Sequence, residues 1–142
     1  MQPVPTLKSV MTPFPHSVEV NADIRTARAM MDQHGIRHLP VTENHKLVGL
    51  LSERDIWVAR NVSDETLAEL SITAGSVCSR NPYVAEITDA LADVVLDMAA
   101  RQVDSAVIVR HDRLAGILTT TDVCRLLGEL LRGLSPGQDI PA

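Results

Sequence analysis

The chain has 142 residues, a formal net charge of −5, 45% hydrophobic residues and only 2% aromatic residues. This length is that of one ordinary domain, and the composition predicts a core built from aliphatic side chains. A nucleic-acid-binding function is excluded, because no run of Lys and Arg could displace counterions from phosphates and the single Trp, Tyr and Phe are too scattered to stack on bases.

The first half of the chain predicts an extended arm followed by a strand and a helix. Residues 1–9 form the arm, and residues 18–20 alternate apolar and polar side chains as a short strand does. Asn21 or Asp23 can cap the helix that follows. Gly35 can end that helix, because glycine readily adopts the left-handed conformation. The apolar residues of this helix recur at helical spacing: Ile24, Ala27 and Met31.

Two strands and a second helix complete the first half. Residues 39–42 and 47–51 are apolar runs joined by the polar segment 43–46, which is typical of two strands and a tight turn. A helix then begins near Ser52 and runs to about Arg60.

The second half predicts the same order of elements. Residues 84–87 indicate a strand, and Thr88 is the expected cap of a helix with apolar residues at helical spacing. Residues 106–109 and 114–118 indicate two strands around a polar turn, and a helix follows over residues 119–131.

An internal repeat explains this shared order. Residues 49–55 (GLLSERD) return as residues 116–122 (GILTTTD), a shift of 67 residues that carries residue 49 onto residue 116. The predicted boundaries are repeat one at 9–60, a linker at 61–76 with a short helix over 64–70, repeat two at 77–132, and a flexible tail at 133–142. Each half of about sixty residues is marginal alone, so the two are expected to pack face to face and share one core.

The doubled Gly-x-x-[Ser/Thr]-x-x-Asp motif is open to two interpretations. A Ser or Thr followed three residues later by an acid, at the start of a helix, resembles a capping box. Alternatively, the helix N-terminus offers free N–H groups to an anion, the hydroxyl can donate to a phosphate, and the Asp can accept both hydroxyls of a ribose. The second interpretation makes each motif half of a nucleotide site.

Three sets of residues resemble a known family: residues 10–13 (VMTP), residues 35–41 (GIRHLPV) and the two Gly-to-Asp segments. Over about residues 9–132 the chain resembles a pair of CBS domains, the adenosine-nucleotide-sensing tandem often called a Bateman module. The resemblance implies an α/β (α+β) fold of two β-α-β-β-α repeats packed about a pseudo-twofold axis. It also implies that AMP, ADP, ATP or S-adenosylmethionine binds in the two clefts between the repeats as a regulatory ligand, with no cofactor and no metal. Two such modules often form a disk-shaped homodimer.

The resemblance also implies roles for individual residues. Asp55 and Asp122 would hold ribose hydroxyls, and Ser52 and Thr119 would contact the ribose or the first phosphate. Two further residues, Arg37 and His38, are expected to face phosphates. Ile36 and Val103 would form apolar walls for the adenine, and Ser105, which occupies the position of His38 in the second repeat, is the last candidate.

The second repeat departs from the family pattern. Asp104 stands where the first repeat has Arg37, and Val107 replaces the proline found at position 40. A carboxylate beside a phosphate repels it, so the two clefts are expected to differ in affinity.

Other candidate sites are weaker. His34 and His38 have a spacing that suits a metal, but Gly35 interrupts the helix between them and no third ligand is evident. Cys78 and Cys124 form no CxxC motif and are expected to be buried small side chains.

The leading hypothesis is a non-enzymatic cytoplasmic regulator that binds an adenosine ligand and acts on an output protein carried by another chain. The sequence has no signal peptide, no apolar stretch of membrane-spanning length and no catalytic constellation. Two alternatives remain: a structural dimerisation module that binds no nucleotide, which Asp104 and Val107 favour, and a small enzyme that acts on the bound nucleotide.

Overall fold

The computed structural model describes residues 3–13, 16–62 and 72–134 of the chain. The elements, in chain order, are α1 (Leu7–Val10), β1 (Thr12–Pro13), β2 (Val18–Glu19), α2 (Ile24–His34), β3 (His38–Glu43), β4 (Lys46–Ser52), α3 (Glu53–Val62), α5 (Ala74–Val77), β5 (Val84–Glu86), α6 (Leu91–Arg101), β6 (Ser105–Arg110), β7 (Arg113–Thr119) and α7 (Thr120–Arg132). The mixed α+β fold and its β-α-β-β-α order in each half are therefore confirmed. The helix expected over 64–70 and the tail from residue 135 onward lie outside the described residues.

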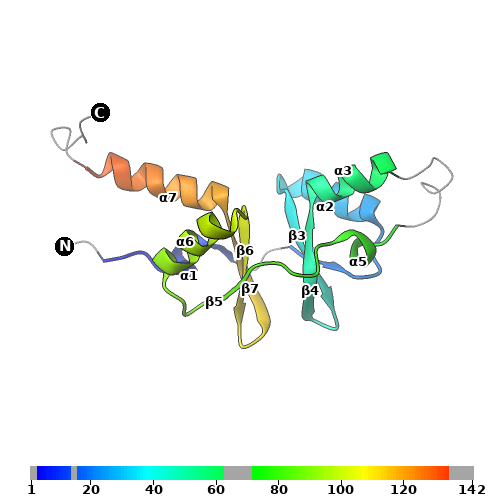
Figure 1. Cartoon of the computed structure of the whole chain (residues 1–142), viewed down its shortest axis with the longest axis horizontal. Coiled ribbons are helices and arrows are strands. Elements are labelled where there is room, and N and C mark those ends of the chain that lie inside the picture. The colour runs from blue at the N-terminus through cyan, green and yellow to red at the C-terminus, as the bar shows by residue number, and fades with distance from the viewer. Residues whose placement is uncertain (1–2, 14–15, 63–71, 135–142) are drawn as a thin grey trace.

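Two sheets lie at the centre of the molecule. One has the strand order β2-β3-β4 and the other the order β1-β7-β6-β5. Helices α2, α3 and α5 gather on the outer side of the first sheet, and α1, α6 and α7 on the outer side of the second (Figure 1). The two halves thus meet through their sheets, as the pseudo-twofold arrangement requires.

Helix capping follows the sequence for α2 and departs from it for α6. The Asp23 carboxylate accepts a hydrogen bond from the Arg25 backbone N–H at 2.8 Å, and Gly35 ends α2 with φ 63°. The prediction that Thr88 caps α6 is wrong, because the helix begins at Leu91 behind Ala90, which makes no side-chain cap. The preceding residues form a turn instead, in which the Glu86 N–H donates to the Asp89 carboxylate at 3.0 Å.

The N-terminal segment of each half packs against the other half. Strand β1 pairs with β7, where Thr12 is opposite Ile117, and the Leu7 side chain is completely buried in the second half. Conversely, α5 hydrogen-bonds to the first half, where the Ala74 N–H donates to the Ala22 carbonyl at 2.7 Å. The extended arm expected over residues 1–9 is also corrected: residues 7–10 form a helix, because Thr6 caps it and Leu7 has an apolar site to fill.

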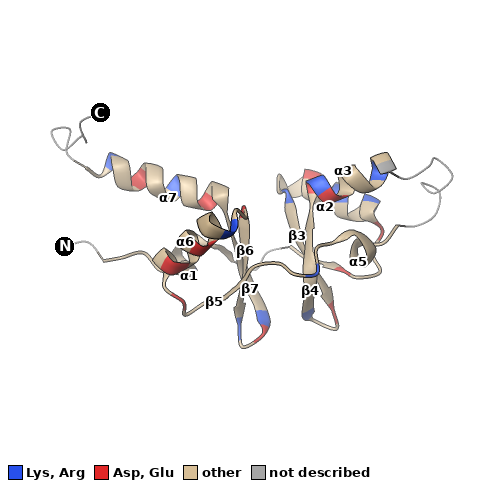
Figure 2. Ribbon diagram, viewed as in Figure 1, with Lys and Arg blue, Asp and Glu red and all other residues tan. Residues whose placement is uncertain are grey.

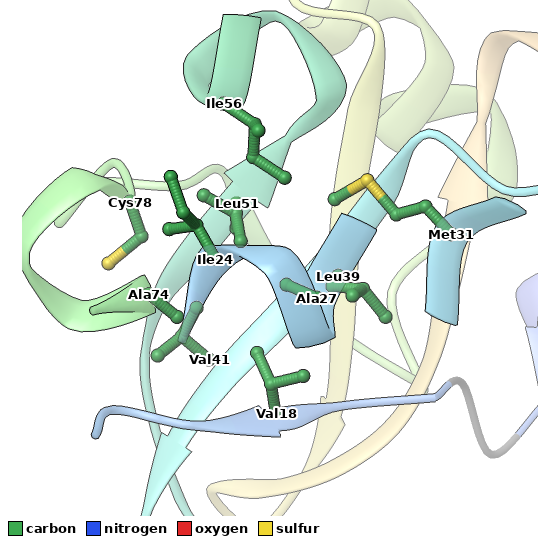
Figure 3. Close-up of a cluster of buried hydrophobic side chains, with 10 residues drawn as sticks. All are labelled: Val18, Ile24, Ala27, Met31, Leu39, Val41, Leu51, Ile56, Ala74 and Cys78. Atoms are coloured by element: carbon green, nitrogen blue, oxygen red, sulfur yellow. The ribbon is translucent and has the colours of Figure 1, made fainter. Parts of the chain in front are cut away.

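Each sheet has its own core, so the single shared core expected from the sequence is wrong. The first cluster lies between the β2-β3-β4 sheet and its helices and includes Leu39, Leu51 and Ile56 together with Ala74 from the exchanged α5 segment (Figure 3). The second includes Leu118 and Ile108 together with Leu7 and Met11 from the exchanged N-terminal segment. The exchange lets each half of marginal size complete its core with side chains from beyond its own repeat.

The glycines that open the two motifs allow a close approach of backbones. A Cβ on Gly49 would collide with the carbonyl oxygen of Ser79 and lie 2.8 Å from the Cys78 sulfur, and a Cβ on Gly116 would lie 2.7 Å from the Thr12 carbonyl oxygen. The repeated glycines therefore let the exchanged segments run directly beside β4 and β7.

Candidate functional site

Two of the clefts that the described residues of both halves line contain the candidate residues, whereas a separate groove at residues 44–46 and 111–113 contains none of them. The first, of about 680 Å³, contains six of the candidate residues: Arg37, His38, Ser52, Asp55, Val103 and Ser105. The second, of about 600 Å³, contains the other three together with two of the same residues: Ile36, Thr119, Asp122, Arg37 and His38. We call them the Asp55 cleft and the Asp122 cleft. Both volumes lie within the range of about 300–1,000 Å³ that small-molecule sites occupy.

The clefts combine the repeats in a crossed manner. The Asp55 cleft joins the motif of the first repeat to Val103 and Ser105 of the second. The Asp122 cleft joins the motif of the second repeat to Ile36 of the first. This pairing follows from the sheet-to-sheet packing. It places the start of each motif helix opposite the residues at the beginning of β3 or β6 in the other half.

The Asp55 carboxylate has one oxygen available to a ligand. Its Oδ2 accepts a hydrogen bond from the Ser52 N–H at 2.9 Å, and the Asp55 N–H donates to the Ser52 hydroxyl at 3.0 Å. This reciprocal pair is a capping box at the start of α3. Within the described residues no donor lies on Oδ1, and the side chain is half-buried in the cleft wall. The cap and the ligand-binding role are therefore compatible.

The Asp122 carboxylate is held on both oxygens. Its Oδ2 accepts from the Thr119 N–H at 2.9 Å in the equivalent capping box. Its Oδ1 accepts from the Thr12 hydroxyl at 3.3 Å and from Arg125 Nη1 at 3.4 Å. The residue is only 6% exposed. A ribose could reach this carboxylate only by sharing or displacing these donors, so the two acids, equivalent in sequence, differ as acceptors.

The helix N-termini offer fewer free amides than the motif predicts. The first amide of α3, on Glu53, donates to the Arg37 carbonyl at 2.8 Å. The first amide of α7, on Thr120, donates to the Asp104 carbonyl at 2.9 Å. Because the capping boxes bind a further amide in each helix, the expected anion site at the helix entrance is reduced, and phosphate recognition would depend more on side chains.

Asp104 does not stand as an isolated carboxylate. Its Oδ1 lies 3.3 Å from Nε2 of His38, which comes from the other half. The His38 side chain is 14% exposed and that of Asp104 is 71% exposed. The expected repulsion of a phosphate by Asp104 is therefore opposed wherever His38 is protonated and remains paired with it.

Four further residues line the clefts at repeat-related positions and were not identified from the sequence. His16 lines the Asp122 cleft and Tyr83 the Asp55 cleft, while Thr12 and Ser79 form a second such pair. Each pair is separated by the same 67 residues as the two motifs, since residue 16 is carried onto residue 83. Extending the repeat alignment to every polar or ring-bearing position would have found them.

Tyr83 is held in place at the wall of the Asp55 cleft. Its hydroxyl donates to Asp97 Oδ2 at 3.2 Å, and the Arg101 guanidinium carbon lies 4.6 Å from the ring centroid. Burial, supplemented by the hydrogen bond to Asp97, raises the pKa of the phenol above its usual value. The ring therefore presents a neutral, oriented surface to the cleft.

The two cysteines differ, which corrects half of the expectation for them. Cys78 is buried in the first core, and burial raises the pKa of its thiol, so it remains an unreactive small side chain. Cys124 is exposed on α7.

No described group of His, Cys, Asp and Glu side chains has the geometry of a metal site. His34, a candidate for such a site, stacks instead on His16, with 3.6 Å between the ring centroids.

No helix in the described part of the chain is both long enough and apolar enough to cross a bilayer.

Comparison with known proteins gives one family. The model of the CBS domain matches residues 7–56 and again residues 74–129. The chain is 28% identical over 120 residues to the CBS domain-containing protein YhcV of Bacillus subtilis, covering 83% of this chain and 82% of that one. It is 27% identical over 128 residues to L-aspartate semialdehyde sulfurtransferase of Methanocaldococcus jannaschii, covering 89% of this chain but only 24% of the enzyme.

Solved structures show the same arrangement. The CBS domain pair of protein MJ0100, solved in complex with 5′-methylthioadenosine and S-adenosyl-L-methionine, matches with a TM-score of 0.78 and 27% identity, covering 90% of this chain and 99% of that one. CBSX2, solved in complex with AMP, matches with a TM-score of 0.75 at 22% identity, covering 89% and 98%. The second likeness supports the fold alone.

Proposed function

Since this chain belongs to the CBS domain family as a tandem pair, we propose that it is a non-catalytic regulatory module that binds an adenosine-containing small molecule in the Asp55 cleft. The observation that carries the proposal is the Asp55 carboxylate, whose Oδ1 has no donor within the described residues although the side chain is half-buried in a cleft of about 680 Å³. A half-buried acceptor with an unused oxygen is suited to a ligand hydroxyl.

The surroundings of Asp55 suit the other parts of an adenosine. Val103 and Tyr83 offer an apolar and an aromatic surface to a base, and Ser52 supplies a hydroxyl next to the carboxylate. The related CBS pair of protein MJ0100 was solved with two adenosine derivatives, which supports the same ligand class here. AMP, ADP, ATP and S-adenosylmethionine all carry the ribose that this arrangement would recognise.

A thermal-shift panel tests the proposal. We expect AMP, ADP, ATP, 5′-methylthioadenosine or S-adenosylmethionine to raise the melting temperature, because a ligand at one hundred times its Kd adds about 2.7 kcal/mol of stability. Guanosine and cytidine, which share the ribose but not the adenine, serve as controls. No shift with any adenosine compound would favour the structural module, for which the two capping boxes already give Asp55 and Asp122 a purely structural role.

We further propose that a second copy of the chain covers the C-terminal half of α7. Four leucines at helical spacing, three on α7 and one just beyond its end, are exposed: Leu127 (55%), Leu130 (48%), Leu131 (56%) and Leu134 (51%). Figure 1 shows that this end of α7 extends beyond the sheets. Acidic and basic residues alternate along α7 (Figure 2), so an antiparallel copy that pairs Leu130 with Leu131 would set Glu129 opposite Arg132.

The dimer is tested by mass. Leu127→Glu combined with Leu131→Glu is expected to convert the dimer into a monomer, because it places charges among leucines that the second copy would bury. The readout is molar mass by size-exclusion chromatography with light scattering. Leu96→Glu, at a residue 67% exposed on α6, is the control and should leave the dimer intact. A monomeric wild-type protein at micromolar concentration would refute the arrangement.

A further inference from the structure

Three side chains line both clefts at once. Arg37, His38 and Asp104 belong to the wall of the Asp55 cleft and also to the wall of the Asp122 cleft. Arg37 is engaged only loosely, since its Nε lies 4.0 Å from Glu53 Oε2 and its side chain is 83% exposed. His38 and Asp104 are in contact across the boundary between the halves at 3.3 Å. The clefts are therefore neighbouring sites with a common wall.

The common wall is attached to both motif helices. The Arg37 carbonyl accepts the first amide of α3, which carries Asp55. The Asp104 carbonyl accepts the first amide of α7, which carries Asp122, and also the Thr120 hydroxyl at 3.2 Å. The backbone at the His38–Asp104 contact is therefore joined by hydrogen bonds to the start of both motif helices.

We infer that the two clefts share His38, so that a phosphorylated ligand bound in one cleft weakens the binding of a phosphorylated ligand in the other. The inference rests on the proposed function and extends the same ligand class to the Asp122 cleft. A protonated His38 donates through both ring nitrogens, but Nε2, the nitrogen that faces Asp104, can pair either with Asp104 or with one phosphate at a time. When it turns to the first phosphate it releases the Asp104 carboxylate, which faces both clefts and repels the second phosphate.

The coupling depends on the phosphate and not on the nucleoside. An uncharged adenosine derivative makes no demand on His38 and leaves its contact with Asp104 in place. Two such molecules are therefore expected to bind independently, whereas two molecules of AMP are not. This difference separates competition for His38 from any general effect of filling both clefts.

Isothermal titration calorimetry with AMP and with 5′-methylthioadenosine tests the inference. In the wild-type protein the ratio of the first to the second AMP affinity is expected to exceed the same ratio for 5′-methylthioadenosine by at least about fivefold, the lower end of ordinary coupling between sites. In Asp104→Asn the two AMP affinities should differ less. If the wild-type protein shows only one AMP-binding event, the appearance of a second event in Asp104→Asn supports the inference equally. 5′-Methylthioadenosine should bind alike in both proteins. Asp112→Asn, an exposed acid in the β6–β7 turn, is the matched control.

Three results would overturn the inference. They are two equal AMP events in the wild type, a single AMP event in both wild type and Asp104→Asn, and an AMP coupling unchanged by Asp104→Asn. His38→Gln provides a second check, because it removes the shared cation and should also abolish the dependence of coupling on phosphate. If no adenosine compound binds at all, the proposed function fails as well, whereas independent AMP binding at both clefts refutes only the sharing of His38.

Discussion

Asp55→Ala is expected to weaken the binding of an adenosine ligand about 5- to 150-fold, because it leaves ribose hydroxyls unpaired in a half-buried cleft at a cost of about 1–3 kcal/mol. In the proposed site Oδ1 would bind the ligand, whereas Oδ2 accepts the hydrogen bond of the α3 cap, so the variant should also lose about 1 kcal/mol of stability. Affinity is measured by calorimetry with 5′-methylthioadenosine, which avoids the phosphate-dependent effects at His38.

Asp122→Ala provides the contrast for this prediction. Because both oxygens of Asp122 are held by protein donors and the residue is 6% exposed, its loss should reduce stability more than the loss of Asp55 does. Its effect on binding in the Asp55 cleft should be smaller. Equal affinity in Asp55→Ala and wild type would remove the ribose assignment from Asp55.

Leu7→Ala is expected to destabilise the protein by about 2–5 kcal/mol, the usual cost of truncating a fully buried leucine. Leu7 lies near the N-terminus but is completely buried in the core of the second half, beside Leu118 and Met98. The loss should appear as a lower urea midpoint, with the folded state still reached in the absence of denaturant.

Val4→Ala is the control for the exchanged segment. Val4 is 80% exposed three residues earlier in the chain, so its truncation should change stability by less than about 0.5 kcal/mol. If Leu7→Ala is no more destabilising than Val4→Ala, α1 does not complete the second core, and the exchange of segments between the halves is refuted.

The sequence predicts local structure well here because the local signals are strong. Asp23 and Gly35 mark the two ends of α2, and the helical recurrence of Ile24, Ala27 and Met31 identifies the face that is buried. The turns at 44–45 and 111–112 lie within the polar segments that separate the predicted strands. Periodicity, however, identifies which face of an element is buried and not which element covers it. Periodicity therefore could not predict that α1 and α5 pack against the opposite halves.

For the site, too, sequence spacing located the motifs but did not predict the contacts that each motif makes. Repetition identified both motifs, and both form capping boxes at the walls of clefts. The difference between the two acids arises from Thr12 and Arg125, which lie 110 residues before and three residues after Asp122 in the sequence. Only the fold brings Thr12 to that carboxylate, and Val58 occupies the position equivalent to Arg125 in the first repeat.

Asp104 illustrates how a partner across the fold changes the meaning of a substitution. In the sequence it replaces a basic residue and predicts repulsion of a phosphate. In the structure it contacts His38, so a protonated imidazole would offset the charge of the same carboxylate. The charge of the residue was evident from the sequence, but its effect depends on a contact between residues 66 positions apart.

A titration followed by two-dimensional ¹H–¹⁵N NMR tests most directly whether an adenosine ligand uses the Asp55 cleft. With 5′-methylthioadenosine, the largest amide shifts should fall on residues 52–55 and 103–105, which come from opposite halves and line that cleft together. Saturable shifts at both segments would support the proposed function. Shifts confined to the separate groove at residues 44–46 and 111–113, or no shifts with any adenosine compound, would contradict it.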